Sequence, residues 1–254
     1  MSSRDAFTEA QWDQRWNAEQ VVYDPSLEPQ LRDSLALIMR FWPRAEGRFL
    51  EAGCGPAANA LNLARRGVDV TGVDLSPNAL AEAQREFERR GLPGRFVRGD
   101  VRDLPFDDAM FDFVYAGGVV EHFRELDVAL ADLARVLRPG GRLLITVPAL
   151  TLSYPYLFFR GNVPAVRLAE GVVSAFHFDL LGGRLAPFGY ERSFLRRRVV
   201  RELEAARLSA VEADRFDTYL PLAQVPSRLR ESARRLARTN AFAPMYFGTG
   251  VRPE

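Results

Sequence analysis

The stretch RFLEAGCGPAA, residues 48–58, decides the fold. A short run with strand character leads into Gly53 and Gly55, and a pattern of helical period begins near Ala57. Glycines between a strand and a helix allow a tight turn and let backbone N–H groups approach a ligand closely. The stretch therefore predicts a strand, a ligand-binding turn and a helix.

The alternation of short apolar runs and helix-like segments continues from Gly47 to Pro148. Further strands are expected over residues 68–74, 94–100, 111–118 and 142–148. One helix is expected over residues 57–66. A second should run from Ser76, which can cap it ahead of Pro77, to Gly91, and a third should carry the leucine stripe 126, 130, 133 and 137. Strands that alternate with helices indicate βαβ units and a parallel sheet.

Three regions lie outside this regular part. Residues 1–46 include a helical stretch over about 27–41 and are expected to form an N-terminal helical cap on one domain that spans residues 47–254. Residues 149–193 are rich in aromatic side chains and predict a substrate-side insertion or lid, because insertions this long are usually functional. A helix with Leu195, Val199 and Leu203 on one face, a strand over 210–216, a helix over 227–238 and a strand over 245–250 complete the chain.

Composition excludes several classes of protein. The formal net charge of +1 over 254 residues offers no broad footprint for nucleic acid. The single cysteine, Cys54, cannot form an internal disulfide, and with only two histidines there is no Cys/His cluster to hold zinc. All 34 basic residues are arginine, so no lysine can form a Schiff base. Without a signal-like or membrane-spanning segment, the expected location is the cytoplasm.

The glycine turn alone has two interpretations. Gly53 and Gly55, with Ala58 in the third position, fit the fingerprint of an NAD-binding fold. Against this, Glu51 stands two residues before the first glycine, where a dinucleotide-binding strand usually carries an apolar residue. A carboxylate there suits a cationic ligand.

Three further features favour a cationic ligand over NAD. They are Asp74 at the end of the second strand, the segment GDVRDLPF at residues 99–106 and the segment YAGGVVEHF at residues 115–123. With them the chain closely resembles the class I S-adenosylmethionine-dependent methyltransferase family, of the small-molecule type. The resemblance implies a Rossmann-like, doubly wound α/β fold with a seven-stranded, mostly parallel sheet in the order 3-2-1-4-5-7-6. It also implies S-adenosylmethionine as cofactor, with S-adenosylhomocysteine as the product.

The family's cofactor contacts map onto positions at the ends of the first four strands. The turn would lie under the methionine and ribose, and Asp74 would bind both ribose hydroxyls. Leu75 would pack on the adenine ring, Asp100 and Val101 would meet its edge, and the fourth strand would receive the methionine ammonium. The implied cofactor-binding residues are Glu51, Gly53, Gly55, Asp74, Leu75, Asp100, Val101, Ala116 and Gly117. One departure is Ala57, where the family often has glycine.

Two residues after the fourth strand are candidates for catalysis. Methyl transfer depends first on alignment of acceptor, methyl and sulfur, and a hydroxyl acceptor of high pKa also needs a general base. His122 is the first candidate for that base and Glu121 the second, as a base or substrate contact. A structural role near the cofactor explains the same pair equally well.

The sequence gives weaker signals for the residues that would contact the acceptor. Tyr154, Tyr156 and His177 lie in the aromatic insertion and could line the pocket, or could simply pack in a loop. Trp12 and Trp16 share one helical face and could close over the cofactor, although such a stripe is also typical of core. The run Arg196–Arg198 could bind an acidic substrate, but it is interpreted as a solvated helix face.

These observations predict methyl transfer from S-adenosylmethionine to a small, apolar or aromatic acceptor, with O-methylation favoured. The alternatives are an N- or C-methyltransferase, a non-catalytic cofactor-binding protein and, most distantly, an NAD-dependent oxidoreductase. No nucleic-acid partner is expected. Contact of the insertion with a membrane surface is an additional hypothesis, and the oligomeric state stays open.

Overall fold

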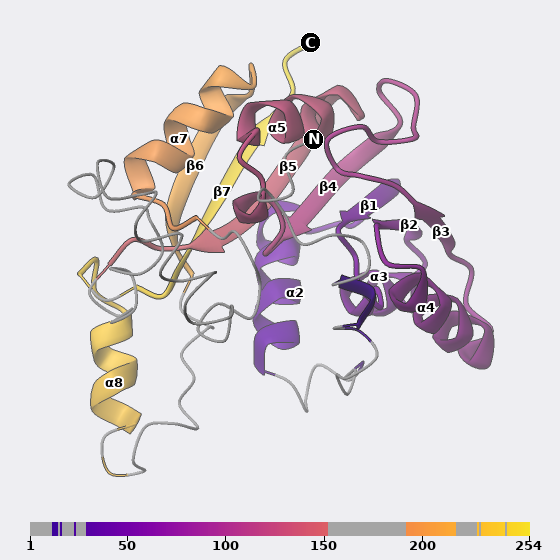
Figure 1. Cartoon of the computed structure of the whole chain (residues 1–254), viewed down its shortest axis with the longest axis horizontal. Helices are drawn as coiled ribbons and strands as arrows, with labels where there is room; N and C mark the ends of the chain where they lie inside the picture. The colour runs from indigo at the N-terminus through magenta and orange to yellow at the C-terminus, as the bar shows by residue number, and fades with distance from the viewer. Residues whose placement is uncertain are drawn as a thin grey trace.

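A twisted sheet of seven strands in the order β3-β2-β1-β4-β5-β7-β6 forms the centre of the molecule (Figure 1). The strands β3, β2, β1, β4 and β5 pair in parallel, whereas β7 is antiparallel to both β5 and β6. The expected strand order is confirmed. The strands are β1 Arg48–Ala52, β2 Asp69–Asp74, β3 Arg95–Arg98, β4 Phe111–Gly117, β5 Leu137–Pro148, β6 Ser209–Phe216 and β7 Met245–Val251.

The structure is a computed structural model, and it describes residues 12–14, 16, 23, 29–151, 192–216, 228, 230–241 and 243–254. The sequence-predicted acceptor residues Tyr154, Tyr156 and His177 lie outside these ranges. Within them the helices are α2 Pro29–Phe41, α3 Ala58–Ala64, α4 Pro77–Arg90, the short 3-10 helix η1 Val120–His122, α5 Leu126–Arg135, α7 Arg196–Ala205 and α8 Arg230–Ala237.

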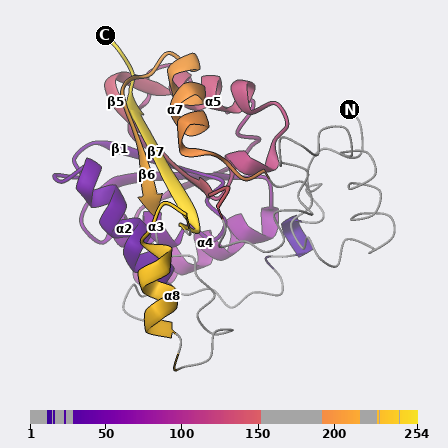
Figure 2. The same cartoon turned by 90° about the vertical axis from the view of Figure 1, so that its left-hand side faces the viewer.

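Helices cover both faces of the sheet (Figures 1 and 2). One core cluster joins α2, α3 and α4 to the sheet, and a second joins α5 and α7 to the opposite face. The alternation of side chains along β4 feeds both: Phe113 packs on the first side, and Val114 and Ala116 on the second. This is the three-layer arrangement expected of a doubly wound α/β fold.

Local sequence signals set the ends of α4 as predicted. The Ser76 hydroxyl accepts the Ala79 N–H at 3.1 Å, Pro77 occupies the first turn, and Gly91 ends the helix in the left-handed conformation. The start of α4 is therefore fixed directly beside the end of β2.

The expected boundary between α5 and β5 was wrong. Leu137 was placed on the helical stripe, but α5 ends at Arg135 and Leu137 begins β5, paired with Phe111. The register shifts before Phe113 pairs with Arg142, so the intervening residues form an irregularity in the strand. Leucine spacing alone cannot separate a buried strand start from a last helical turn.

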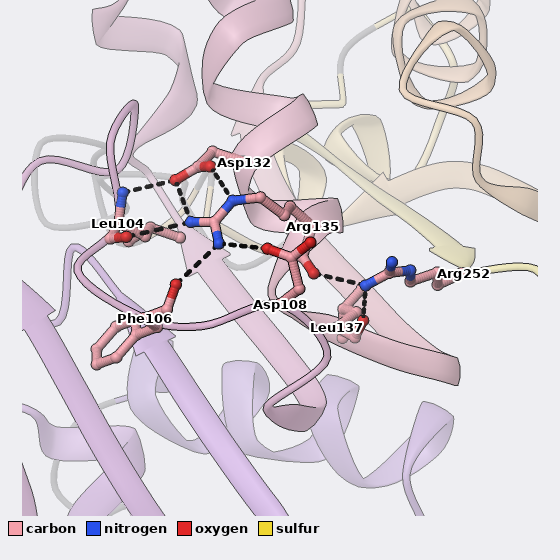
Figure 3. A network of polar contacts seen from close by, with 7 residues as sticks. All are labelled: Leu104, Phe106, Asp108, Asp132, Arg135, Leu137 and Arg252. Carbon is pink, nitrogen blue, oxygen red and sulfur yellow. Dashed lines mark hydrogen bonds and ion pairs between the residues drawn. The ribbon is translucent and has the colours of Figure 1, made fainter.

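Arg135 at the end of α5 ties the segment after β3 to this helix (Figure 3). Its Nε donates to Asp132 at 2.6 Å, and the Asp132 carboxylate accepts the N–H of Leu104 at 2.5 Å. Further acceptors of the guanidinium are the carbonyls of Leu104 and Phe106 and the Oδ1 of Asp108. Arg252 donates to the carbonyl of Arg135 at 2.5 Å, which adds the last residues of the chain to the network.

In the ranges that the structure covers, no helix combines the length and the apolar character needed to cross a bilayer.

Candidate active site

The predicted cofactor residues lie at or just beyond the ends of β1, β2, β3 and β4, at the carboxyl edge of the parallel strands. Ligands of open α/β sheets bind at this edge. The turn after β1 is built on two glycines with left-handed backbone, Gly53 at φ 65° and Gly55 at φ 51°. A Cβ on Gly53 would meet Val119 at 2.5 Å, and one on Gly55 would meet the Trp16 indole at 2.6 Å. Both positions therefore require glycine for conformation and for space.

Asp74 links the end of β2 to the glycine turn. Its Oδ2 accepts the N–H of Gly55 at 2.7 Å and its Oδ1 accepts the N–H of Ser76 at 2.9 Å. Burial raises the pKa of this carboxyl above its ordinary value, and the backbone hydrogen bonds oppose that rise. Two of the roughly four acceptor positions of the carboxylate are used, which leaves room for a vicinal diol.

Glu51 is fully enclosed beneath the turn. Its carboxylate accepts hydrogen bonds from Asn59 Nδ2 and from the N–H of Ala60, both at 2.8 Å. Burial raises its pKa to about 7, and the charge of Asp74 adds to the rise, while the two hydrogen bonds oppose it. Asn59 in turn accepts a hydrogen bond of 2.6 Å from Ser34 on α2.

The two carboxylates of Glu51 and Asp74 have backbone and amide partners and no ion pair with any arginine of the described residues. A cation bound over the turn would lower the electrostatic cost of keeping both charged. The residues present thus fit a ligand that combines a positive charge with a diol. Cys54, between the two glycines, has a pKa well above its ordinary value because of burial and these two acids.

The end of β4 places the predicted catalytic pair close to this turn. Ala116 is fully buried and Gly117 is half-buried at the end of the strand, and Glu121 and His122 lie in the short helix η1 just beyond. Both side chains are buried, at 3% and 7% exposure. The His122 ring meets the Trp12 ring edge-on, with centroids 5.1 Å apart.

The predicted adenine-side residues follow β2 and β3. Leu75, directly after Asp74, is half-buried. Val101 packs into the core, so it could reach a ligand only through its backbone. Asp100 is held by Arg102, whose Nη2 donates to Oδ2 at 2.6 Å. Burial alone would raise the pKa of Asp100, but the hydrogen bonds and charge of Arg102 bring it below its ordinary value.

Two contributors to this edge were not predicted from the sequence. Arg102 also pairs with Glu125 and lies over the Phe123 ring, so it connects the segment after β3 to the start of α5. Asp13 accepts hydrogen bonds from Ser76 and Asn78 at the start of α4. Asp13 belongs to no motif. Arg102 lies within the segment GDVRDLPF, but only the fold shows that it pairs with Glu125. No cluster of side chains suited to a metal occurs among the residues described.

Comparisons with known proteins agree with this geometry. The methyltransferase domain family matches residues 50–145, which contain the turn, Asp74 and η1. The demethylmenaquinone methyltransferase of Thermus thermophilus is 41% identical over 147 residues, which are 57% of this chain and 59% of that protein. The fatty-acid O-methyltransferase of Mycolicibacterium smegmatis is 43% identical over 101 residues, 39% of this chain and 36% of its own length. The chain therefore spans less than two thirds of these relatives.

Among solved structures, the [4+2]-cyclase SpnF superposes with a TM-score of 0.61, at 21% identity over 87% of this chain and 80% of that one. Such a likeness establishes the fold. The sheet order, the glycine turn bonded to Asp74 and the family match lead to one conclusion: residues 50–145 match the methyltransferase domain family and have the fold of that domain.

Proposed function

We propose that the protein transfers the methyl group of S-adenosylmethionine to the oxygen of a small, apolar or aromatic acceptor. The observation that carries the proposal is the pair of buried carboxylates, Glu51 and Asp74, which flank a glycine turn and lack an arginine partner within the described residues. The names of the two relatives, which refer to demethylmenaquinone and a fatty acid, support an apolar acceptor.

In this proposal the cofactor supplies an electrophilic methyl on a positively charged sulfur. Asp74 holds the ribose hydroxyls with its remaining acceptor positions, and Glu51 keeps the turn in shape by fixing the start of α3. With the cofactor bound, His122 would take the proton of the acceptor hydroxyl as its oxygen accepts the methyl group. The buried position of His122 against Trp12 holds the ring in one orientation.

Two further regions of the chain would enclose the cofactor and the acceptor. Residues 1–46 cap the cofactor side, and residues 149–193, with Tyr154, Tyr156 and His177, cover the acceptor. The proposed location is the cytoplasm, where Cys54, a free and buried thiol, stays reduced.

Two measurements test the proposal. Calorimetric titration with S-adenosylmethionine and with NAD should show saturable binding of the first alone, and NAD binding without S-adenosylmethionine binding would leave the dinucleotide interpretation. Radiolabelled methyl should then appear in an O-linked product when phenols, quinols and fatty acids are screened. Cofactor binding with no transfer to any hydroxyl, carboxyl, amine or carbon acceptor would point to the non-catalytic alternative.

The role of His122 is separable from binding. With a series of phenols of falling pKa, His122→Gln should lose most activity on the least acidic phenol and least on the most acidic one, because a phenolate needs no base. Glu121→Gln, at the second candidate for the base, is measured on the same series, and a graded loss in this variant with an even loss in His122→Gln would assign the base to Glu121. An equal loss along the series would assign His122 a structural role instead.

A further inference from the structure

The described residues of the N-terminal segment lie across the edge where the cofactor residues gather. Trp16 covers Gly55 after β1, Trp12 meets His122 after β4, and Asp13 binds the residues after β2. The short helical piece at residues 12–14 lies beside the start of α4 in both views, drawn in the darkest indigo (Figures 1 and 2). One short segment thus contacts the ends of three neighbouring strands.

Asp13 is the polar anchor of this segment. Its Oδ1 accepts the Ser76 hydroxyl at 2.7 Å and the N–H of Asn78 at 2.8 Å, and its Oδ2 accepts Asn78 Nδ2 at 2.6 Å. Hydrogen bonds to an ionised carboxylate are roughly twice as strong as neutral ones. The positive end of the 14-residue helix α4 adds a further attraction for the negative charge.

Ser76 connects this anchor to the cofactor site. Its backbone N–H donates to Asp74 while its hydroxyl donates to Asp13, so two carboxylates are held by one residue. A change at Asp13 therefore acts on the residue that orients Asp74. It also releases the segment that carries the two indoles over the turn and η1.

We propose that Asp13 is a positioning residue for the cofactor: it latches residues 12–14 and Trp16 over the carboxyl edge and slows cofactor release. This inference rests on the proposed S-adenosylmethionine site and adds the element that closes it. In the latched state Trp12 and Trp16 exclude water from the turn. Cofactor exchange requires the three hydrogen bonds of Asp13 to break.

The test uses the fluorescence of the latch itself. The chain has three tryptophans, so a Trp42→Phe background reports only Trp12 and Trp16. Stopped-flow mixing with S-adenosylhomocysteine gives the association rate, and displacement by excess S-adenosylmethionine gives the dissociation rate. Asp13→Ala should raise the dissociation rate about tenfold, as expected from the loss of charge-assisted hydrogen bonds, with a smaller rise in association rate.

Three further variants make the test specific. Glu88→Ala removes an exposed acid from α4, the helix whose start Asp13 binds, and should leave the association and dissociation rates unchanged. In Asp13→Asn the new amide faces the Asn78 amide, and adding Asn78→Asp exchanges donor and acceptor between the two side chains. The double variant should return the dissociation rate to within about twofold of the wild type, which a merely structural contact elsewhere would not do.

Other outcomes overturn the proposal in recognisable ways. A lower Kd for S-adenosylhomocysteine in Asp13→Ala, from faster association alone, would mean that Trp16 blocks the site instead of closing it. Unchanged association and dissociation rates in Asp13→Ala would show that Asp13 does not latch the segment. If the wild type binds no S-adenosylhomocysteine, both the proposed function and this role of Asp13 are overturned. This outcome is distinguished from the others because it is seen in the wild type, before any residue is substituted.

Discussion

The N–H of Gly55 donates to Oδ2 of Asp74 across 2.7 Å, and this hydrogen bond joins the turn after β1 to the end of β2. The two residues are 19 positions apart, and each is at the place where the cofactor would lie. The bond makes the shape of the turn depend on the carboxylate. Asp74 therefore stabilises the chain at this point, in addition to the ligand contact that the proposed function gives it.

Asp74→Ala should weaken S-adenosylmethionine binding by at least about tenfold, because charge-assisted hydrogen bonds to the ribose are lost. Calorimetric titration measures this effect. Asp69→Ala is the matched control, since Asp69 is exposed at the other end of the same strand. Circular dichroism must show the same fold for both, and equal affinities of the two variants would refute the assignment of Asp74.

Glu51 should make stability depend on pH. Its pKa is raised by burial from 4.5 to about 7 in the folded protein, so the folded state binds more protons than the unfolded state between these values. The free energy of unfolding should therefore fall as the pH rises from about 4.5 to 7, by an amount of the order of a few kcal/mol. Urea unfolding at a series of pH values measures it.

The comparison for this prediction is Glu51→Gln, which keeps the size and removes the titrating group. Asp74 remains and its pKa is raised in the same direction, so part of the pH dependence should persist in the variant. A wild type and a Glu51→Gln variant with the same pH slope would show that Glu51 stays charged throughout.

The strands and the turn could be predicted because their signals are local. Alternating apolar runs, Ser76 and Pro77 at a helix start and glycines at a turn act within a few neighbouring residues. The sheet order required the resemblance to a family, since strand periodicity says nothing about which strands pair across a sheet.

Other features could not be predicted because they depend on distant parts of the chain. Asp13 and Ser76 are 63 positions apart, and no motif marks an acid between two tryptophans as an anchor. Arg102 pairs with Asp100, two positions away, and also with Glu125, 23 positions away, and only the fold brings this second partner within reach. At the α5–β5 boundary, Leu137 suits a helix and a strand equally, and its pairing with Phe111 places it in the strand.

Arg135 should contribute more to stability than an ordinary surface arginine. Its guanidinium bonds to two carboxylates and two carbonyls, so Arg135→Ala leaves several partly buried acceptors without a donor (Figure 3). We expect a loss of about 2 kcal/mol in the free energy of unfolding, measured by urea titration. Arg85→Ala, which breaks an exposed pair with Glu82, should cost less than about 0.5 kcal/mol, and equal costs would contradict the network's importance.

Ala57 carries a methyl group in a conformation that alanine disfavours. Its φ of 59° is left-handed, yet its side chain is completely buried at the start of α3. In Ala57→Gly the relief of roughly 1 kcal/mol of backbone strain opposes a loss of about 0.8 kcal/mol for the buried methyl. The free energy of unfolding should thus change by less than about 1 kcal/mol once the added freedom of glycine is included.

Ala60→Gly isolates the strain at Ala57. Ala60 is also completely buried, but it lies inside α3, with no left-handed backbone. Its replacement loses the methyl and about 1 kcal/mol of helix propensity with nothing to offset them, so it should cost about 2 kcal/mol. Equal losses in the two glycine variants, measured by denaturant unfolding, would mean that Ala57 stores no strain and that its methyl group alone accounts for the effect.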